Sequence, residues 1–455
     1  MDRFDSISPL DYRYSDEEVS KFLGEESRIK HQALIEAALA GVLAKNGICS
    51  PGVADEITKA ASEVNAKEVY DEENITRHDI RALVNMIRKR VSDEAKPFVH
   101  FCATSYDIID TANSCRYKQA TSELILPALR ELESTFIDLA IREKATVQVG
   151  RTHGQHAVPI TFGFAISEYV SRLGGRIKEI EEKKDGLVGK FSGAVGAYNA
   201  SSLLNKDPMK FEKDLMEELG LKASISSNQV VEPEPLLDLI HAVISAFGVL
   251  ANFSDDMRNL QRSEINEVAE AFGKKQVGSS TMPHKRNPIN FENVKSMWKE
   301  FFPRINTFYM DALTDHQRDL TNSASARFIP EIFAAFYSSI VRLQRITKKL
   351  VVDNASMQRN FDMNKKMIIA EPLYILLAFY GHNDAHEAVR ELTLASQQSG
   401  KALMEIAFED KSLAPFIEKF SDEQKALLQE PEKYIGQAVA KTEILCEYWK
   451  SELKL

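Results

Sequence analysis

Apolar residues recur at three- and four-residue steps through the middle third of this 455-residue chain. This spacing lines one face of a helix, and no alternating strand pattern of comparable length competes with it. The repeating positions are Leu129, Leu132, Phe136 and Leu139; Ile166, Val170, Leu173, Ile177 and Ile180; Leu236, Ile240, Val243, Phe247 and Leu250; and, seven residues apart, Phe336, Leu343 and Leu350. We predict an all-α fold around a bundle of long helices, whose several apolar faces favour a homo-oligomer.

Polar and helix-breaking positions divide the chain into three predicted helical domains. Residues 1–107 form an N-terminal domain, residues 108–351 the central long-helix bundle, and residues 352–455 a C-terminal domain of shorter helices. Within the first domain, the box from Ser15 to Glu18 and the cap at Ser50 predict helix starts. The spacing Thr104-x-x-Asp107 predicts another, at the entrance to the bundle.

Composition narrows the class of protein. Hydrophobic content is 44% and the net charge is -10, which argues against broad nucleic-acid binding. The first residues lack a signal-peptide pattern, and charged residues interrupt the most apolar runs, so we expect no membrane partner. Four widely spaced cysteines indicate a reduced, cytoplasmic chain without structural zinc.

One stretch, Gly278 to Asn290, interrupts the helical pattern with a glycine and two prolines and is therefore predicted to be a loop. It carries hydroxyls, an imidazole, two fixed cations and an amide, an inventory suited to an anion held beside a proton-transfer group. A solvated basic connector is the alternative. The stretch lacks the lysine of a P-loop and the second glycine of a hydrolase elbow, which excludes both motifs.

Other polar clusters admit two interpretations each. The run Arg77-His78-Asp79 is a surface salt-bridge group or part of a site. The run from Gly150 to Pro159 is predicted to be a turn that holds two histidines, His153 and His156. The arginines and hydroxyls from Arg318 to Arg327 are typical of a phosphate site.

The loop Gly-Ser-Ser-Thr-Met-Pro-His-Lys-Arg-Asn-Pro resembles the signature loop of the fumarase/aspartase superfamily. A cycloisomerase branch of that superfamily has a similar loop. The clusters from Arg13 to Arg327 resemble, in the same order, those of the adenylosuccinate lyase family. Beyond them the chain resembles the family only in its general helical character.

The resemblance implies β-elimination of fumarate from adenylosuccinate, giving AMP, and from the succinyl-carboxamide ribotide SAICAR, giving AICAR, in purine biosynthesis. It assigns Ser279 as general base and His153 as general acid, with Glu292 orienting that histidine and His78 as a second active-site histidine. It also implies a homotetramer with sites shared between subunits, small-molecule succinyl-nucleotide substrates, and no metal or organic cofactor.

The same resemblance implies a larger set of substrate-binding residues. They are Arg13, Tyr14, Arg77, Asp79, His100, Thr104, Ser105, Gln229, Ser280, Lys285, Asn287, Arg318, Ser323 and Arg327. Lys285 and Asn287 suit the charge that builds on a carboxylate when the neighbouring proton leaves. One departure from the family is Cys102-Ala103, where glycine and a larger apolar residue are frequent; it leaves the Thr104 and Ser105 hydroxyls in place.

Two alternatives remain open on sequence grounds. One is another superfamily lyase or the lactone-forming cycloisomerase, against which the arginine clusters favour a phosphorylated substrate. The other is a non-catalytic helical scaffold, against which the intact acid, base and loop residues argue.

Overall fold

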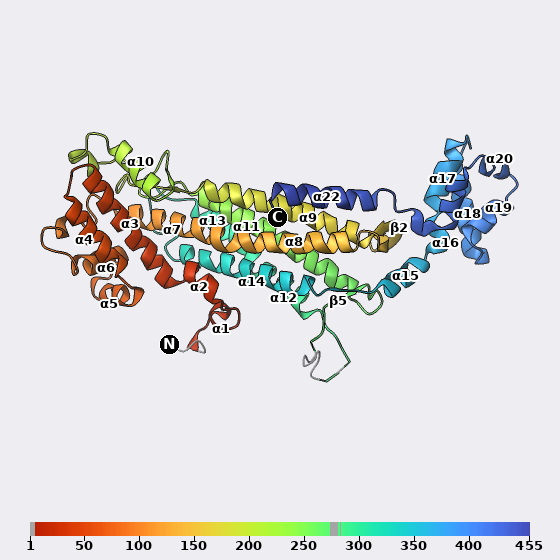
Figure 1. The fold of residues 1–455 in the computed structure, drawn as a ribbon, viewed down its shortest axis with the longest axis horizontal. Helices are drawn as coiled ribbons and strands as arrows, with labels where there is room; N and C mark the ends of the chain where they lie inside the picture. Colours follow the sequence, from red (N-terminus) through yellow and green to blue (C-terminus); the bar gives the residue numbers. More distant parts are fainter. Residues whose placement is uncertain (1–4, 274–280, 283) are drawn as a thin grey trace. The chain divides into compact units, whose positions relative to one another are not determined.

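The computed structural model describes residues 5–273, 281–282 and 284–455. Helices dominate this described chain, and its strands form short two-stranded pairs, so the all-α prediction is confirmed (Figure 1). The chain divides into two compact units. Unit 1 is Met1–Arg130, Gly175–Leu250 and Ser296–Val341; unit 2 is Glu131–Gly174, Ala251–Lys295 and Arg342–Leu455.

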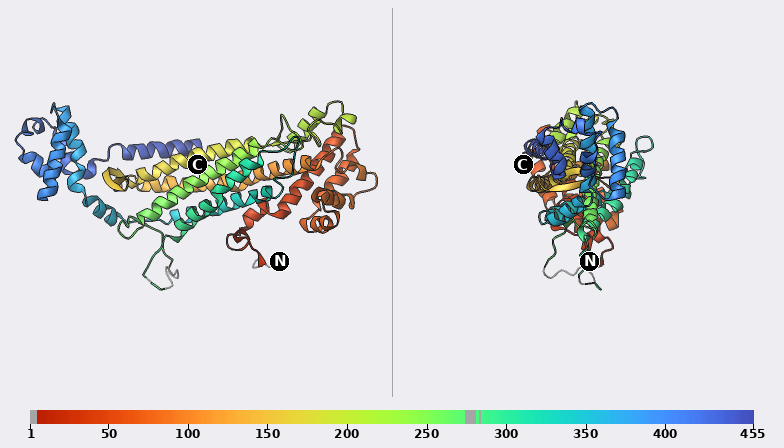
Figure 2. Two further views of the ribbon diagram at one scale, coloured as in Figure 1. Left: turned by 180° about the vertical axis from the view of Figure 1, so that it is seen from behind. Right: turned by 90° about the vertical axis from the view of Figure 1, so that its right-hand side faces the viewer.

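The first part of unit 1 is a cluster of helices around one apolar core. The helices are α1 (Pro9–Tyr12), α2 (Glu17–Leu23), α3 (Glu25–Lys45), α4 (Pro51–Ser62), α5 (Ala66–Thr76) and α6 (Asp79–Arg88), followed by a 3-10 turn (Lys96–Phe98). Helices α3 and α4 lie side by side, as both Figure 1 and Figure 2 show. Ile35, Leu83, Ile87 and Ile108 are fully buried between these helices and the one that follows.

The helix starts in this cluster follow from their caps. The Ser50 hydroxyl accepts the Val53 N–H at 3.3 Å, which begins α4 as predicted. The prediction for α2 was wrong by one residue, because Asp16 rather than Ser15 is its cap. The Asp16 carboxylate accepts the Glu18 N–H at 2.8 Å, and a charged acceptor suits the positive end of a helix.

The rest of unit 1 consists of longer helices. Helix α7 (Ser105–Ala120) continues through a π-helical turn (Thr121–Ile125) into α8 (Leu126–Arg142). The remaining elements are the later part of α9 (Phe162–Asp185), β3 (Val188–Gly189), a 3-10 turn (Ser201–Leu203), α10 (Pro208–Glu218), β4 (Lys222–Ala223), most of α11 (Glu234–Leu260), the end of α12 (Ile289–Phe301), a 3-10 turn (Phe302–Arg304), α13 (Ile305–Asp311), a 3-10 turn (Ser325–Phe328) and the start of α14 (Ile329–Thr347). Strands β3 and β4 pair in parallel. Stacking of Tyr117 on Phe333, with ring centroids 5.4 Å apart, ties α7 to α14.

Unit 2 combines the other parts of these helices with the C-terminal region. Its further elements are β1 (Val147–Thr152), β2 (Gln155–Thr161), β5 (Val268–Ala269), β6 (Val351–Val352), α15 (Asn354–Asp362), α16 (Lys365–Ile368), α17 (Ala370–Phe379), α18 (Ala385–Ser399), α19 (Leu403–Glu409), α20 (Ala414–Ile417), α21 (Asp422–Gln429), a 3-10 turn (Pro431–Lys433) and α22 (Ala438–Glu452). Helices α17 and α18 pack together around buried Leu373, Leu377 and Leu403. Gly174 of α9 gives the Trp449 ring of α22 its space, since a Cβ there would lie 2.4 Å from the ring.

The repeating apolar positions predicted from the sequence lie in the interior of both units. Each of these residues is buried except Leu236, which is half-buried. In unit 2, Phe136 of α8 meets Phe253 of α11 with ring centroids 4.5 Å apart. Helix α11 is long and apolar enough by composition to span a membrane, but 67% of its apolar window is buried inside the protein, as in a core helix.

Candidate active site

The first turn of α7 is the centre of the candidate site in unit 1. Thr104 is its N-cap and Ser105 its first residue. The Asp107 carboxylate accepts the Thr104 N–H at 2.8 Å, the capping contact that the sequence predicts. The first N–H groups of a helix have no intrahelical partner and lie at the positive end of its dipole. Two hydroxyls therefore flank a backbone that can bind an anion.

Arg318 is held against this helix start. Its guanidinium lies over the Tyr106 ring at 4.8 Å, and its Nη2 donates to the Tyr106 hydroxyl at 3.2 Å and also to Asn322 Oδ1. Within the described ranges, Arg318 Nε is buried and has no hydrogen-bond partner. A fixed guanidinium with an unsatisfied donor is well suited to a phosphate or carboxylate.

Gln229 is brought to the same helix by its neighbours in the chain. Asp110, in the second turn of α7, accepts the Val231 N–H at 3.0 Å, and the Gln229 N–H donates to the Gln317 carbonyl at 3.3 Å. Burial raises the pKa of Asp110 to about 6, although the Val231 hydrogen bond and the charge of Lys190 act in the opposite direction. Unit 1 thus brings Thr104, Gln229 and the Arg318 segment together.

The run Arg77-His78-Asp79 forms the junction between α5 and α6. Arg77 closes α5 in the left-handed conformation with φ of 57°, and His78 is the N-cap of α6. The His78 Nδ1 accepts the Arg81 N–H at 3.4 Å, which leaves the ring proton of a neutral imidazole on Nε2. Asp79 Oδ1 lies 3.5 Å from the same Nδ1. Arg77 and His78 are exposed, so both can reach a ligand.

His100 lies four residues before Thr104 and has an unusual partner. Its Nδ1 lies 2.6 Å from Oε1 of Glu36, a side chain buried in α3. Burial lowers the pKa of His100, but the charge and hydrogen bond of Glu36, assisted by Asp107, outweigh burial and leave that pKa raised above its ordinary value.

The remaining predicted residues of unit 1 lie at its surface. Arg13 is exposed and caps the C-terminal end of α1, and Tyr14 follows it, half-buried. Ser323 and Arg327 are exposed in the segment that leads into α14. These side chains stay candidates for binding, and Arg318 is the member of the arginine cluster that contacts α7.

In unit 2, His153 occupies the tip of a β-hairpin. The sequence predicts a turn here, and the structure adds that β1 and β2 pair antiparallel around it, with Thr152 opposite Gln155. His153 and Gly154 have φ of 53° and 75°, and two positive φ values are typical of the type I′ turn that closes such hairpins. The exposed imidazole is therefore presented at a tight, defined turn.

The buried carboxylate of Glu267 holds this hairpin in place. Glu267 accepts two hydrogen bonds from the Arg151 guanidinium, at 2.5 and 3.1 Å, and one each from Gln148 at 2.7 Å and Asn360 at 2.8 Å. Its side chain is fully buried, so its charge depends on these donors. Two of its partners belong to β1, two and five residues before His153.

The signature loop is described only in part. Ser279 and Ser280 lie outside the described residues. Lys285 is exposed and Asn287 half-buried in an irregular segment that ends where α12 begins, and Glu292 is exposed in the first turn of α12. The loop prediction is confirmed for the described residues from 281 to 288, and it is wrong for Ile289 and Asn290, which already belong to α12.

A second buried carboxylate, that of Glu270, caps the start of α12 directly after this loop. Glu270 accepts the backbone N–H groups of Asn290 at 2.9 Å and Phe291 at 3.0 Å, and the Asn290 side-chain amide at 2.6 Å. These bonds satisfy the otherwise unpaired donors of the helix start. Glu270, which precedes the loop, therefore holds the start of the helix that carries Glu292.

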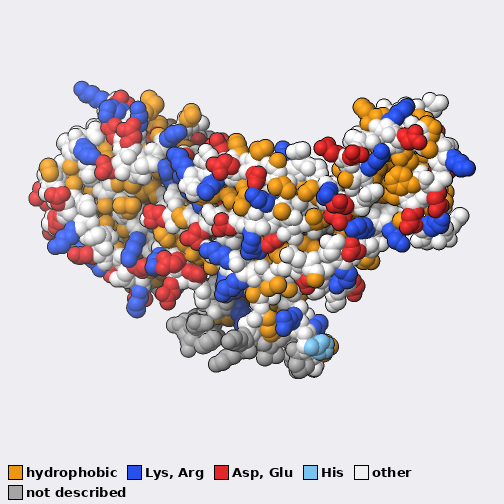
Figure 3. Space-filling model, turned by 45° about the vertical axis from the view of Figure 1, so that its right-hand side comes forward, with side chains coloured by type: hydrophobic (Ala, Val, Ile, Leu, Met, Phe, Trp, Pro, Cys, Tyr) orange, Lys and Arg blue, Asp and Glu red, His pale blue; other side chains and the backbone are white. Residues whose placement is uncertain are grey.

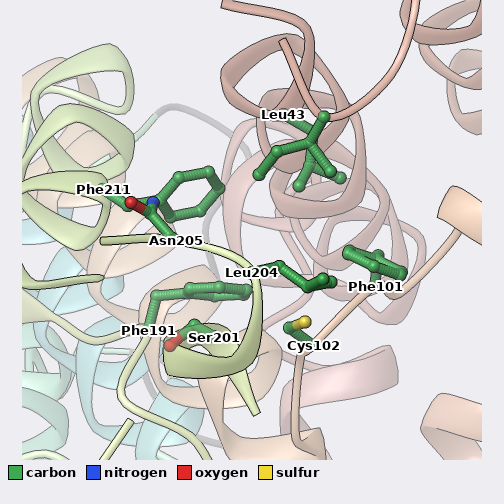
Figure 4. A pocket seen from close by; sticks show the side chains of 9 residues that line it. Leu43, Phe101, Cys102, Phe191, Ser201, Leu204, Asn205 and Phe211 are labelled. Atoms are coloured by element: carbon green, nitrogen blue, oxygen red, sulfur yellow. The ribbon is translucent and has the colours of Figure 1, made fainter. Parts of the chain in front are cut away.

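The departure at Cys102 falls behind the helix cap rather than in front of it. Cys102 has φ of 62° and lines a small apolar pocket with Phe101, Phe191 and Phe211 (Figure 4). Burial raises the pKa of its thiol. Thr104 keeps its place at the start of α7, so the substitution changes packing and spares the cap.

Positive and negative side chains are mixed on one face of the protein. On the face drawn in Figure 3, Lys and Arg side chains are interspersed with Asp and Glu. In the ranges that the structure describes, no three His, Cys, Asp or Glu side chains group closely enough to hold a metal ion.

Sequence reasoning missed four acids and one lysine that position these groups, all buried except the half-buried Asp110: Glu36, Asp110, Lys190, Glu267 and Glu270. Glu36 and Lys190 do carry a local signal, because each is a charged residue inside an otherwise apolar run. A charged residue at such a position must find a partner when it is buried. The sequence alone does not name that partner.

Comparison with known proteins identifies the chain's relatives. A family model described as Lyase matches residues 3–300, and one described as Adenylosuccinate lyase C-terminal matches residues 314–435. An adenylosuccinate lyase of Pyrococcus horikoshii is 35% identical, covering 97% of this chain and 98% of the relative. One from Bacillus subtilis is 31% identical, covering 90% and 94%.

The fold has close counterparts among solved structures. The 3-carboxy-cis,cis-muconate lactonizing enzyme of Pseudomonas putida matches 98% of this chain and 99% of its own with a TM-score of 0.85, at 24% identity. That likeness shows a shared fold and no more. The fold and the match to the Lyase family model together define the class of protein, an all-α lyase of the fumarase/aspartase superfamily. Within this class the full-length relatives decide the branch: the chain belongs to the adenylosuccinate lyase family.

Proposed function

We propose that this protein eliminates fumarate from adenylosuccinate, giving AMP, and from SAICAR, giving AICAR. The observation that carries the proposal is that the segments carrying Gln229 and Arg318 are both held against α7, the helix that Thr104 and Ser105 begin. A substrate with a phosphate and two carboxylates needs such a group of hydroxyls, amide and guanidinium. Relatives called adenylosuccinate lyase, at 31 to 36% identity, support the choice of substrate.

In the proposed reaction, the Ser279 oxygen takes the proton from the carbon next to the one that bears the leaving nitrogen. The C–N bond breaks, His153 donates a proton to the nitrogen, and fumarate forms. Lys285 and Asn287 stabilise the charge that develops on the substrate carboxylate, and Glu292 orients His153. The tight hairpin turn and the exposure of His153 support its role as the acid.

His78 is the second active-site histidine in this proposal. The substrate is bound by Arg13, Tyr14, Arg77, Asp79, His100, Thr104, Ser105, Gln229, Ser280, Lys285, Asn287, Arg318, Ser323 and Arg327. The exposure of Arg77 and the held guanidinium of Arg318 support the assignment of these two residues to anionic groups.

The protein acts as a homotetramer whose sites combine residues from different subunits. The exposed apolar side chains of Leu313, Leu320 and Phe328 support an interface between copies. Separate apolar cores support a terminal domain on either side of the central bundle, with bounds 1–107, 108–351 and 352–455. The first core lies within residues 29–99 and adds Ile108 and Ala112 from the bundle helix that follows; the second lies within residues 369–428. Four free cysteines support a cytoplasmic location.

Substrate turnover tests the proposal directly. The purified protein is offered adenylosuccinate, SAICAR, argininosuccinate, malate, aspartate and a carboxymuconate, and fumarate or lactone formation is followed by absorbance. Turnover of both succinyl nucleotides is expected. Turnover of malate, argininosuccinate or the carboxymuconate alone would overturn it.

A further inference from the structure

The partner of His100 is Glu36, and its carboxylate contacts His100 in a specific geometry. Glu36 comes from the middle of α3, and its carboxylate is fully buried. Both of its oxygens serve one residue: Oε2 accepts the His100 backbone N–H at 3.0 Å, and Oε1 lies 2.6 Å from His100 Nδ1. The His100 backbone itself has a positive φ of 63°, a conformation that costs free energy for residues other than glycine.

A purely structural role does not explain this arrangement. Holding one backbone N–H requires only a neutral acceptor, whereas an isolated buried carboxylate is strongly unfavourable. The second oxygen of Glu36 contacts a ring that can carry the compensating positive charge. The pair is therefore electrically matched when His100 is an imidazolium, with one N–H given to Glu36.

The surroundings of His100 place it at the candidate site of unit 1. Asp107 in the first turn of α7 and Arg81 in the first turn of α6 both act on it electrostatically, Asp107 favouring the charged ring and Arg81 opposing it. Its ring is partly exposed, with 20% of the side chain accessible. With Nδ1 engaged by Glu36, Nε2 is the nitrogen left to meet a ligand.

We propose that Glu36 is a positioning residue, which holds the His100 ring so that Nε2–H is offered as a cationic donor to an anionic oxygen of the substrate. This inference rests on the proposed function. The anionic oxygen belongs to a phosphate or to a succinyl carboxylate. The two sources share the same chemistry and are separated by ligands that contain only one of them.

The test is binding measured by calorimetry between pH 6 and 9, with AMP as the phosphate ligand and fumarate as the carboxylate ligand. In the wild type, the affinity for one of them falls as His100 loses its proton at a raised pKa. Glu36→Gln should move this fall to lower pH, towards an ordinary histidine value of about 6.5. At pH 7.5 that ligand should bind roughly tenfold more weakly, while at pH 6 the loss should be much smaller.

Two further variants keep the test decisive. Glu26→Gln, the same change at an exposed position of α3, should leave the profile unchanged. His100→Asn tolerates a positive φ and retains Glu36, and its profile should be flat because the titrating ring is gone. The ligand whose profile changes identifies the oxygen that His100 binds. Substrate KM should rise in Glu36→Gln, while kcat at saturation changes by less than about threefold.

Particular outcomes overturn the inference. One is a wild-type pH profile in Glu36→Gln, or the same loss at every pH, which marks a structural role only. If Glu36→Gln fails to fold, a wild-type pH profile in His100→Asn overturns it equally. Turnover of adenylosuccinate, assayed on the same preparations, decides the proposed function separately. A wild type that neither turns over nor binds either ligand would overturn both.

Discussion

Lys190 and Asp107 form an ion pair in which neither side chain is exposed to solvent. Lys190 Nζ also donates to the Gly193 carbonyl at 3.1 Å, and the Asp107 carboxylate accepts the Thr104 N–H at 2.8 Å. The pair therefore joins the loop after β3 to the start of α7, where the candidate hydroxyls lie. Its electrostatic balance supports the shape of the site as well as the fold.

Lys190→Met should destabilise the protein by about 3–5 kcal/mol, because it leaves the Asp107 charge buried without its partner. The same change should raise KM, since the cap under Thr104 loses its neighbour. Denaturant midpoints and steady-state kinetics measure the two effects. As a control, Lys183→Met removes a half-exposed partner of the exposed Asp238 and should barely shift the midpoint. Equal behaviour of the two variants would contradict the prediction.

Glu267→Ala should lower kcat by roughly 100-fold, because loss of the buried acceptor releases Arg151 and lets the His153 turn shift. Binding of AMP should change much less, since its proposed contacts lie in unit 1. Kinetics together with size-exclusion chromatography separate this effect from loss of assembly. Glu264→Ala, at an exposed position three residues earlier, is the control. Full turnover in Glu267→Ala would show that the hairpin keeps its conformation without the Glu267 carboxylate.

The long helices and the α7 cap could be predicted because their information is local. Apolar positions three and four residues apart determine a helix face, and Thr104 and Asp107 are three residues apart. The His153 hairpin was recognised only as a turn. Its strands are six and seven residues long, and His-Gly is a weaker hairpin signal than Asn-Gly.

The supporting carboxylates could not be assigned for a different reason. Glu267 meets Arg151, 116 residues away in the chain, and Glu36 meets His100 across 64 residues. Such pairs depend on how helices pack, which a local pattern does not encode. The resemblance to a family supplied the residues proposed to bind substrate, and the structure supplied the buried residues that contact them.

Glu133 gives a prediction about stability and pH. It lies in α8 with no side-chain exposure, and in the part of the chain that the structure describes neither carboxylate oxygen has a hydrogen-bond partner. Burial raises the pKa of Glu133 well above its ordinary value. The folded protein therefore retains a proton that the unfolded chain releases. This contribution to stability is complete below the unfolded pKa and is lost as the pH rises towards the folded one.

Glu133→Gln should thus become more stable than the wild type as the pH rises from about 5 to 8, because the amide does not titrate. Between the two pKa values the difference should grow by about 1.4 kcal/mol per pH unit. Urea midpoints at several pH values measure it. Asp138→Asn, an exposed change on the same helix, should show no such slope. A parallel pair of pH profiles for Glu133→Gln and the wild type would mean that Glu133 ionises normally.

The proposed sharing of sites predicts repair between damaged chains. His153→Gln and Ser279→Ala should each lower kcat far more than ligand binding, since one removes the acid and the other the base. If the two residues reach one site from different subunits, a mixed tetramer contains some sites in which both residues are intact. Random mixing of the two variants should give such sites in roughly a quarter of cases, for a closed symmetric assembly with independent pairing.

Mild dissociation and reassociation of the two inactive proteins should therefore restore part of the wild-type activity. Recovery should require exchange of subunits, so crosslinking each tetramer before mixing should abolish it. Mixing two preparations of the same variant controls for refolding, because no combination of its chains restores the missing residue. Native mass spectrometry with isotope-labelled chains verifies that mixed tetramers form. Verified mixed tetramers without recovered turnover would mean that His153 and Ser279 of each site come from one chain. In that case each site takes both residues from the same damaged chain, and mixing cannot give a site in which both are intact.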